Sequence, residues 1–370
     1  MWRRDDLLLH HVFMQRSLAA ETFFLAFRMK TRVLSTKIAV RKRSIVTAAR
    51  LIREGHLVAF PTETVYGLGA NANDNEAVRR IFRVKGRPID NPLIVHIWSL
   101  SQVALLAREI PLMFWVLAER FLPGPLTMVL KKSPGVPAVV TSGLSTIALR
   151  LPGNPVARAL LRAVDLPVVA PSANLSGRPS PTTPHHVLED LNGKIAAVLD
   201  GGRSTIGVES TVLDISGPVP TILRPGGITE EEIEDAVHVH VRRARSTVTR
   251  PASPGMKYRH YAPRTEIVVF EGTKRGVLQA MVSMVRQKIG RGIAVGVMAE
   301  SSARDRFPGA EFFSLGDRGA SGAARRLYEG FRWLDRRSVS LILCQSFPDE
   351  EIGRAFMNRL RKAATRRIRV

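Results

Sequence analysis

The feature that most constrains the fold is the alternation of short apolar runs with helical patterns along residues 45–235. Short runs bounded by turn residues are typical of strands, and apolar positions spaced by 3.6 residues are typical of amphipathic helices. Many of the turns between them contain Pro and Gly. The pattern predicts one α/β domain whose strand candidates are 57–60, 93–97, 126–130, 146–150, 168–170, 197–199, 211–215 and 221–223.

A second, shorter region repeats this alternation after residues 242–264, which are rich in Arg, Ser, Pro and Gly and lack apolar periodicity. Such a composition is typical of an interdomain linker. Strand-like runs then follow at 267–270, 293–298, 312–315 and 339–344. Because helical patterns separate these runs, the sequence predicts a small, parallel, Rossmann-like α/β domain. We therefore expect an N-terminal extension over 1–37, a first domain over 38–241 and a second over 265–370.

The formal net charge is +23, which favours an anionic partner such as RNA or a nucleotide. Residues 1–43 hold ten Lys or Arg against three acids, and residues 354–370 hold seven against none. The two ends therefore contribute +14 and the rest of the chain +9. A solvated basic tail is the usual explanation of such runs, and a specific nucleic-acid site is the less favoured one.

Cys344 is the only cysteine, so neither a disulfide nor a thiolate metal cluster can form within one chain. A reducing compartment such as the cytoplasm fits this composition. No apolar stretch reaches the roughly 18 residues of a transmembrane helix, and polar residues interrupt the apolar clusters of residues 1–28. We expect neither a membrane segment nor a signal peptide, and we expect residues 1–28 to be disordered or to precede a natural start at Met29.

The first strand of the predicted domain leads through a polar turn into a helix that Asn73 or Asp74 can cap. Gly86 would end this helix, because glycine adopts the left-handed conformation without strain. Lys85 and Arg87 lie on either side of that end. A cation at a helix C-terminus is favourable by about 0.3 to 1 kcal/mol, so Lys85 alone has a structural explanation. The two cations together favour a binding site.

Several familiar catalytic and nucleotide motifs are absent from the sequence. It lacks a G-x-x-x-x-G-K-[ST] phosphate loop, and Gly67 and Gly69 lack the third glycine of a dinucleotide turn because Ala72 takes that position. Ser172 lies outside any G-x-S-x-G nucleophile turn. The histidines form no H-E-x-x-H pattern. These absences argue against P-loop, dinucleotide, serine-hydrolase and zinc chemistry.

Polar groups gather instead in four islands, each beside a strand-like run: 85–91, 145–150, 172–180, and 209–211 with Arg224 shortly after. Guanidinium groups make bidentate contacts with oxyanions, and hydroxyl and amide groups orient the remaining oxygens, as an enzyme that handles a triphosphate requires. Each island alone also has an ordinary explanation as a turn, a surface cation or, at His96, a hydrogen-bonded core histidine.

Taken together, eight ordered motifs resemble the threonylcarbamoyl-AMP synthase family in its two-domain form, a YrdC-like domain followed by a linker and a smaller domain. The motifs are FPTETVYGLG (60–69), KGRPIDNPLIVHI (85–97), PGPLT (123–127), ALRLPGNP (148–155), APSANLSGRPSPT (170–182), ESTVLD (209–214), ILRPGGIT (222–229) and PGMKYRHYAP (254–263). The resemblance runs from about residue 45 to the end, where 357–364 resembles the family's closing helix. It implies a twisted, open, mixed sheet with helices for the first domain.

The resemblance implies a nucleotidyltransferase that condenses L-threonine, bicarbonate and ATP into threonylcarbamoyl-AMP and releases pyrophosphate. Mg²⁺ would accompany the ATP, and no protein ligand for a metal is assigned. A downstream tRNA threonylcarbamoyl transferase would use the product to modify the adenosine beside the anticodon in tRNAs that read ANN codons. We expect a carbamate of threonine to attack the α-phosphorus without a covalent enzyme intermediate.

The resemblance also implies two sets of site residues. L-Threonine would contact Thr64, His96, Arg150, Ala170 and Ser210. ATP would contact Arg87, Asn91, Thr146, Ser172, Asn174, Ser180, Arg224 and His260. The planar fork of Arg150 suits the amino-acid carboxylate, and Lys85 and Arg87 would carry the catalysis. His260 would belong to a lid that excludes water from the labile carbamate and anhydride.

Three alternatives to this interpretation stay open. The first is a basic module that binds RNA, including double-stranded RNA as described for relatives of the fold, without ATP chemistry. The second is a carbamoyl-transfer enzyme of the hydrogenase-maturation type, although its paired CxxC zinc motifs cannot be supplied by one cysteine. The third gives the C-terminal domain a purely structural or regulatory role, since nothing in 265–370 resembles a catalytic motif.

Overall fold

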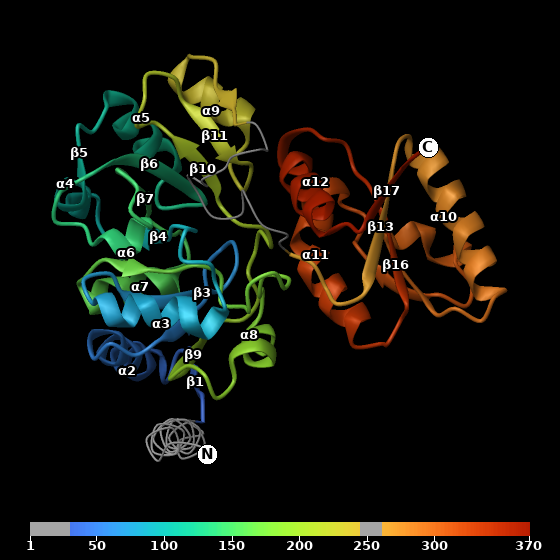
Figure 1. Ribbon diagram of the computed structural model, residues 1–370, viewed down its shortest axis with the longest axis horizontal. Helices are drawn as coiled ribbons and strands as arrows, with labels where there is room; N and C mark the ends of the chain where they lie inside the picture. Colours follow the sequence, from blue (N-terminus) through green and yellow to red (C-terminus); the bar gives the residue numbers. More distant parts are fainter. Residues whose placement is uncertain (1–29, 245–260) are drawn as a thin grey trace, which may run out of the picture.

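The computed structural model describes residues 30–244 and 261–370, which form two α/β domains that lie side by side (Figure 1). The N-terminal domain is built on a sheet in the order β1-β9-β2-β3-β8-β4-β7-β6-β10-β11-β12, with β5 paired to β6. Its strands are β1 (Arg32–Ser35), β2 (Val58–Phe60), β3 (Gly67–Asn71), β4 (Ile94–His96), β5 (Ala107–Arg108), β6 (Leu126–Lys132), β7 (Thr146–Arg150), β8 (Val168–Val169), β9 (Ala197–Asp200), β10 (Thr211–Asp214), β11 (Thr221–Arg224) and β12 (Arg242–Arg243).

This sheet contains both parallel and antiparallel pairs of strands. For example, β4 pairs in parallel with β7, whereas β7 pairs antiparallel with β6. The predicted mixed, open sheet is thus confirmed. Its helices are α2 (Arg41–Arg53), α3 (Asn75–Lys85), α4 (Val103–Leu106), α5 (Leu112–Phe121), α6 (Ala138–Thr141), α7 (Pro155–Val164), α8 (Pro184–Leu191) and α9 (Glu230–Val237), with a 3-10 turn η1 (Leu100–Gln102).

Both faces of the central strand β2 are buried, which explains its uninterrupted apolar sequence. Ala59 contributes to one apolar cluster, together with residues of α3 and α5. Val58 and Phe60 point to the other face and pack with residues of α2 and α7. The sheet is therefore a middle layer between helices, and polar side chains can gather only where its strands end.

The helix α3 has the ends that the sequence predicts. The Asp74 carboxylate accepts hydrogen bonds from the backbone N–H groups of Glu76 and Ala77 at 2.9 and 3.0 Å. Gly86 ends the helix in the left-handed conformation, with φ of 59°. This cap fixes the chain at Lys85 and Arg87, because both immediately adjoin the helix end.

Asp74→Ala is expected to destabilise the protein by about 1 kcal/mol, because two N–H groups in the first turn of α3 lose their acceptor. Urea denaturation of wild type and variant would measure the change. Asp74→Asn, which keeps an accepting oxygen, serves as the matched control and is expected to lose much less. Equal losses in both variants would contradict the capping role.

The C-terminal domain has a fully parallel sheet in the order β15-β14-β16-β13-β17, which confirms the Rossmann-like prediction. The strands are β13 (Glu266–Glu271), β14 (Val295–Ala299), β15 (Glu311–Ser314), β16 (Leu341–Gln345) and β17 (Arg366–Arg369). The helices are α10 (Lys274–Ile289), α11 (Gly319–Asp335) and α12 (Glu351–Ala363), with a 3-10 turn η2 (Ser301–Arg306). Figure 1 shows α11 and α12 on the side of this sheet that faces the N-terminal domain, and α10 on the far side.

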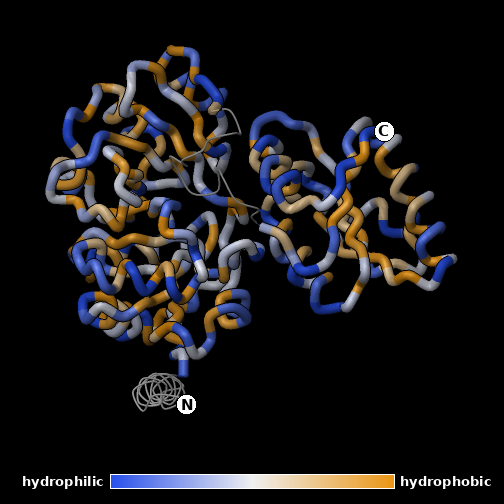
Figure 2. The backbone as a smooth tube through the Cα atoms, viewed as in Figure 1, coloured by the Kyte–Doolittle hydropathy of each residue, from blue (hydrophilic) through white to orange (hydrophobic). Residues whose placement is uncertain are grey.

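An apolar cluster continues across the junction of the two domains. It contains Val65 and Val208 of the first domain together with side chains of α11 and α12, such as Leu327 and Phe356. Figure 2 shows hydrophobic positions concentrated along the sheets and inner helix faces of each domain. Among the described residues, no helix is long and apolar enough to cross a membrane.

The structure differs from the sequence prediction in four places. Arg32–Ser35, predicted within the N-terminal extension, form β1 and pair with β9, so the first domain begins before residue 38. Gly67–Asn71, predicted largely as a turn, form β3, where Gly69 lies so close to the Phe60 ring that a Cβ atom would approach it to 2.9 Å. The predictions for residues 1–29 and 245–260, including His260, lie outside the described residues.

The third difference concerns the basic C-terminal run. Arg366–Arg369 pair in register with β13, and Arg361 and Arg367 both form ion pairs with Glu271. The run is thus a helix and an edge strand rather than a solvated tail. Alternating positions of a strand point to opposite faces, which lets a basic sequence pack against a sheet that carries a carboxylate. The predicted linker is also shorter at its start, because Arg242–Arg243 form β12 beside β11.

Candidate functional site

A cavity of about 60 Å³ lies where several strands of the N-terminal sheet end. His96 at the end of β4 and Arg150 at the end of β7 are direct neighbours in the sheet register. The cavity is lined by Thr64, Val65, Arg87, Ile94, His96, Arg150, Ala170, Pro171, Ser172, Glu209, Ser210, Arg224 and Tyr261. Eight of the fourteen predicted site residues are in this lining, although they come from six separate segments of the chain.

One end of the cavity is built around a buried ion pair. An Arg150 guanidinium nitrogen lies 2.5 Å from Glu63 Oε1, and the two side chains are 5% and 13% exposed. Glu63 Oε2 also accepts the backbone N–H of Asn154 at 3.2 Å. Burial alone would raise the pKa of Glu63, but the charge and hydrogen bond of Arg150 outweigh it and hold the pKa below its usual value. Glu63 was not among the predicted residues, although it lies within the FPTETVYGLG motif.

His96 lies beside this pair as a neutral imidazole. Burial and the positive charge of Arg150 lower the pKa of His96 to about 3. His96 Nδ1 is buried and has no hydrogen-bond partner among the described residues. The Thr64 hydroxyl hydrogen-bonds with the Thr62 hydroxyl at 2.8 Å. This end of the cavity therefore offers a guanidinium, a hydroxyl and a neutral imidazole, with the Glu63 carboxylate paired to the guanidinium, a set that suits a small zwitterion.

The other end of the cavity is cationic. Arg87 donates to the carbonyl oxygens of Asn91 and Pro92 at 3.1 and 2.9 Å, and among the described residues no carboxylate pairs with it. Arg224 donates to the Ser210 carbonyl and hydroxyl oxygens at 3.0 and 3.2 Å. Burial lowers the pKa of both guanidinium groups, which nevertheless stay protonated near neutral pH. A buried and a half-buried guanidinium group lining one cavity favour an oxyanion ligand.

Lys85 and Asn174 lie behind the cavity wall and support one of its loops. Lys85 Nζ donates to the carbonyl oxygens of Ser172 and Asn174, and burial lowers the pKa of the ammonium group well below its usual value. The Asn174 amide nitrogen donates to the carbonyl oxygens of Leu175 and Arg178. Lys85 thus anchors the Ser172 loop to the end of α3, and its catalytic role stays a prediction.

The remaining predicted ATP contacts also lie outside the cavity lining. Asn91 Oδ1 is buried without a hydrogen-bond partner among the described residues. Thr146 begins β7, and the parallel register with β4 places it beside the 87–92 loop, four residues from Arg150. The Ser180 hydroxyl donates to Glu209 Oε1 at 2.5 Å. The structure therefore groups Asn91 and Thr146 near Arg87, and Ser180 near Ser210.

Three further residues that the sequence analysis missed surround Glu209. Tyr328 of α11 donates its hydroxyl to both carboxylate oxygens, at 3.1 and 2.9 Å. Arg359 of α12 lies 2.8 Å from Glu209 Oε2 and is fully buried. Tyr261, which lines the cavity, lies beside the Tyr328 ring with centroids 5.6 Å apart. The C-terminal domain thus reaches the wall of the cavity, which no local pattern in its sequence indicates.

The protein side chains do not form a metal centre in the described part of the chain. There, no group of three or more His, Cys, Asp or Glu side chains is placed to hold a metal ion. The two carboxylates at the cavity, Glu63 and Glu209, are already ion-paired with Arg150 and Arg359. A divalent cation at this site would therefore fit best as part of a nucleotide complex, with the phosphate oxygens as its ligands.

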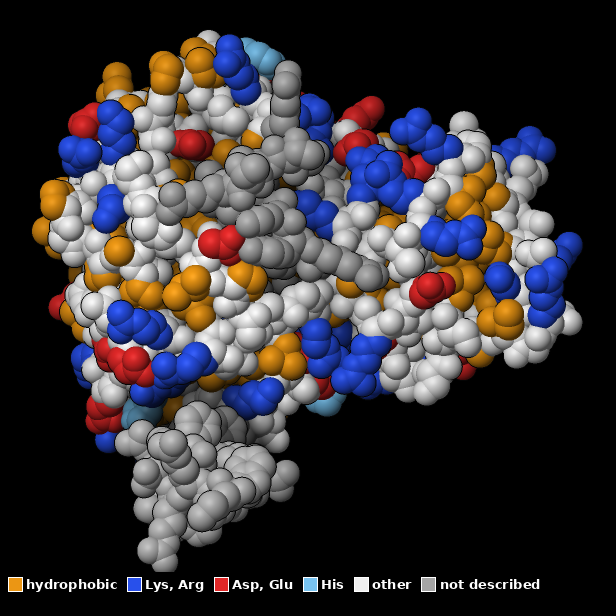
Figure 3. All heavy atoms as spheres, in the orientation of Figure 1, with side chains coloured by type: hydrophobic (Ala, Val, Ile, Leu, Met, Phe, Trp, Pro, Cys, Tyr) orange, Lys and Arg blue, Asp and Glu red, His pale blue; other side chains and the backbone are white. Residues whose placement is uncertain are grey.

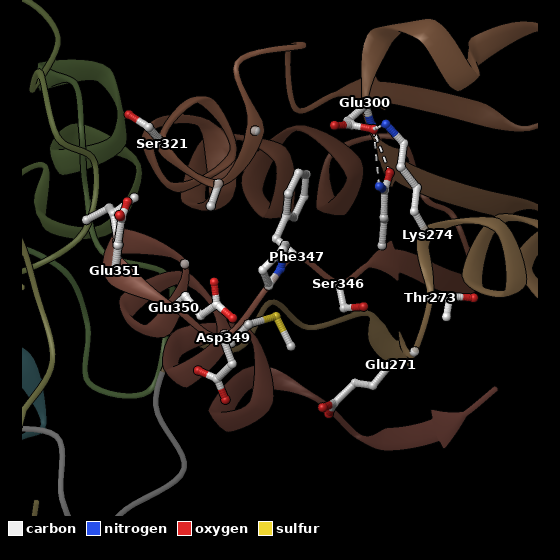
Figure 4. A pocket seen from close by; sticks show the side chains of 18 of the residues that line it. Glu271, Thr273, Lys274, Glu300, Ser321, Ser346, Phe347, Asp349, Glu350 and Glu351 are labelled. Carbon is white, nitrogen blue, oxygen red and sulfur yellow. Dashed lines mark hydrogen bonds and ion pairs between the residues drawn. The ribbon is translucent and has the colours of Figure 1, made fainter.

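A second and larger cavity, of about 840 Å³, lies in the C-terminal domain and contains none of the predicted site residues. Figure 4 shows its side chains, which come from the segments that follow β13, β14, β15 and β16 and from α12. Its cations are largely neutralised internally, because Lys274 pairs with Glu300, and Arg361 pairs with Glu271 and Asp349. This balance of charge contrasts with the cationic end of the smaller cavity.

The surface gives no single basic stripe on the face shown in Figure 3, where Lys and Arg lie in separate groups interspersed with Asp and Glu. Several exposed cations are paired, as in the contact of Arg203 on the first domain with Glu329 on α11. The high net charge is therefore spread over the described surface, at least on this face, rather than concentrated in one groove.

Comparison with known proteins connects the geometry to a family. Residues 50–226 match a family model described as "Telomere recombination", and residues 228–365 match one described as "Threonylcarbamoyl-AMP synthase, C-terminal domain". The chain is 47% identical over 341 residues to a threonylcarbamoyl-AMP synthase of Pyrococcus abyssi, covering 91% of this chain and 99% of the relative. It is 44% identical over 339 residues to one of Bacillus subtilis, covering 90% and 97%.

Solved structures agree with these similarities. A crystal structure of P. abyssi Sua5 complexed with L-threonine matches with a TM-score of 0.88 at 47% identity, covering 92% of this chain and 100% of that chain. The match spans both domains. The arrangement of the two domains is therefore shared with a solved relative.

Proposed function

The chain belongs to the threonylcarbamoyl-AMP synthase family, and we propose that it condenses L-threonine, bicarbonate and ATP into threonylcarbamoyl-AMP with release of pyrophosphate. The support that comes from the chain's own residues is the composition of one cavity. Loops far apart in the sequence bring Arg150, which is paired with Glu63 and suits a zwitterion, into the same cavity as Arg87 and Arg224, which suit phosphate.

At the zwitterion end, Arg150 is proposed to bind the threonine carboxylate, because its planar fork presents two parallel donors. Glu63 already holds the guanidinium in place, and its charge would favour the ammonium group of the amino acid nearby. His96, Thr64, Ala170 and Ser210 would complete the threonine pocket. A neutral His96 adds no repulsive charge beside the ammonium group.

At the cationic end, Arg87, Arg224 and Ser172 are proposed to bind the phosphates, with Asn91, Thr146, Asn174 and Ser180 around them. The carbamate oxygen formed from threonine and bicarbonate would attack the α-phosphorus while pyrophosphate leaves. The cations hold the two reactants in line and neutralise the developing charge, so the chemistry needs no covalent enzyme intermediate. Mg²⁺ arriving with ATP would neutralise further charge on the leaving pyrophosphate.

The proposed product is a mixed anhydride that water hydrolyses. A second enzyme must therefore use it soon after it is released. We propose that this second enzyme is a tRNA threonylcarbamoyl transferase of the cytoplasm, in keeping with the names of the relatives. Direct contact with tRNA, including double-stranded regions, is a weaker proposal that rests on the net charge of +23.

The test is an assay of pyrophosphate release by purified protein with ATP, threonine and bicarbonate, each omitted in turn. We expect release to depend on all three substrates and to form threonylcarbamoyl-AMP, detected by mass spectrometry. Release that ignores threonine would contradict the proposal. The RNA-binding alternative instead predicts RNA affinity that falls steeply with salt and needs no ATP.

A further inference from the structure

We propose that Arg359 and Tyr328 of the C-terminal domain are positioning residues for the nucleotide end of the cavity, and that they act through Glu209. This inference rests on the proposed function and extends it to a domain for which the sequence gives no chemical role. By contrast, Arg354 of the same helix pairs with Glu231, which does not line the cavity.

The Arg359 guanidinium connects two strands of the first domain. Its Nε lies 2.8 Å from Glu209 Oε2, and another of its nitrogens donates to the Pro225 carbonyl oxygen at 2.6 Å. Glu209 stands just before β10 and Pro225 just after β11. Arg359 therefore holds together the two strand ends that contain Ser210 and Arg224, both of which line the cavity.

Glu209 links Arg359 to the residues of the site through direct contacts. Its Oε1 accepts the Ser180 hydroxyl at 2.5 Å, and the residue itself lines the cavity. Tyr328 donates to both carboxylate oxygens, which fixes the rotation of the carboxylate plane. The neighbouring Ser210 accepts from Arg224 through its carbonyl and hydroxyl oxygens. The orientation of Arg224 thus depends on where Glu209 is held.

The charges of Arg359, Glu209 and Arg224 support the same role for Arg359. Burial alone would raise the pKa of Glu209, but the charges of Arg359 and then of Arg224 lower it to about 2, so the group is a carboxylate at neutral pH. A buried carboxylate requires a counter-charge. Without Arg359, the next cation that acts on Glu209 is Arg224, which would then be drawn toward the carboxylate instead of a phosphate.

The test compares Arg359→Met with Arg354→Met. Arg354 lies on the same helix and also pairs with the first domain, through Glu231 at 3.0 Å and Glu230 at 3.5 Å, but its partners are on α9 and away from the cavity. We expect Arg359→Met to lower kcat/KM for ATP by about 10- to 100-fold, by analogy with the loss of a hydrogen-bond partner that orients a metal ligand. Arg354→Met is expected to stay within about twofold of wild type.

If Arg359 only stabilised the domain junction, its loss would weaken the binding of ATP and of threonine to a similar extent. We therefore expect the KM for ATP to rise in Arg359→Met by a clearly larger factor than the dissociation constant for threonine measured by calorimetry, because the Arg150 and Glu63 end is held within the first domain. Arg359→Lys keeps the charge but not the fork, and should recover part of the loss. Tyr328→Phe keeps the ring and should weaken ATP use by a smaller factor.

Kinetics of a folded Arg359→Met that match Arg354→Met would overturn the inference, as would equal changes for ATP and threonine. If Arg359→Met does not fold, Arg359→Lys and Tyr328→Phe decide, and wild-type ATP constants in both would overturn it. A wild-type protein that releases no threonine-dependent pyrophosphate would overturn the proposed function and this inference with it. Active wild type with an unaffected Arg359 variant would overturn the inference alone.

Discussion

Replacing either Arg87 or Arg224 by Ala is expected to lower threonine-dependent pyrophosphate release by about 10²- to 10³-fold, the usual cost of losing one well-placed charge-stabilising donor. Both guanidinium groups line the cationic end of one cavity, where Arg224 is buried and Arg87 is half-buried. Among the described residues no carboxylate pairs with Arg87, so its charge is available to a phosphate. The measurement is the steady-state rate at saturating threonine and bicarbonate.

Two controls separate this catalytic effect from loss of structure. Arg79→Ala removes an exposed cation from α3, the helix that leads to Arg87, and should leave the rate within about twofold of wild type. Arg87→Lys keeps a positive charge without the planar fork and should recover only part of the rate. Thermal unfolding and circular dichroism would verify that all variants are folded. Near wild-type turnover in folded Arg87→Ala and Arg224→Ala would falsify the assignment of the phosphate end.

Much of the fold follows from local signals in the sequence. The Asp74 cap and the Gly86 end of α3 depend on residues within one helical turn, and the structure has both. The predicted strand 146–150 coincides with β7, because a continuous apolar run ends in a charged residue there. Strand β3 was missed because its glycines indicate a turn, and only the packing of the Phe60 ring against them explains their place in a sheet.

Among the site residues, too, local motifs were predictive, whereas contacts between distant parts of the chain were not. The motifs predict Arg87, His96, Arg150 and Arg224, each of which stands at the end of a strand or helix and lines the cavity. The partners of such cations were not predictable in this way. Glu63 and Arg150 are 87 positions apart, and Glu209 and Arg359 are 150 apart, so their pairing appears only when the sheet and the two domains are assembled.

Loss of Arg150 is expected to remove threonine binding, which makes it the second large effect. Arg150→Met should raise the dissociation constant for threonine by at least about 100-fold, since the carboxylate loses a bidentate, charge-assisted partner. The substitution also leaves Glu63 as a buried carboxylate without its counter-charge. Removing one partner of a buried ion pair commonly costs about 3 to 5 kcal/mol of stability. Calorimetry with threonine and urea denaturation would measure the two effects separately.

The double variant Glu63→Gln with Arg150→Met separates binding from stability. Without a charge at residue 63, most of the lost stability should return, whereas threonine binding should not. Arg158→Met, an exposed cation on α7, should change neither quantity. Recovery of threonine binding in the double variant would contradict the role of Arg150 and would show that the single substitution acts only by disturbing the fold.

The pH dependence of stability provides an independent check on the same pair. In the wild type the pKa of Glu63 lies below its unfolded value, so the pair stabilises the protein at neutral pH and this contribution is lost as the pH falls through the folded pKa. In Arg150→Met the largest opposition to burial is lost and only backbone hydrogen bonds remain, so the pKa of Glu63 should rise. The stability gap between wild type and variant should therefore narrow as the pH is lowered, and a gap that stays constant from pH 7 into the acidic range would show that the charge of Glu63 is not its cause.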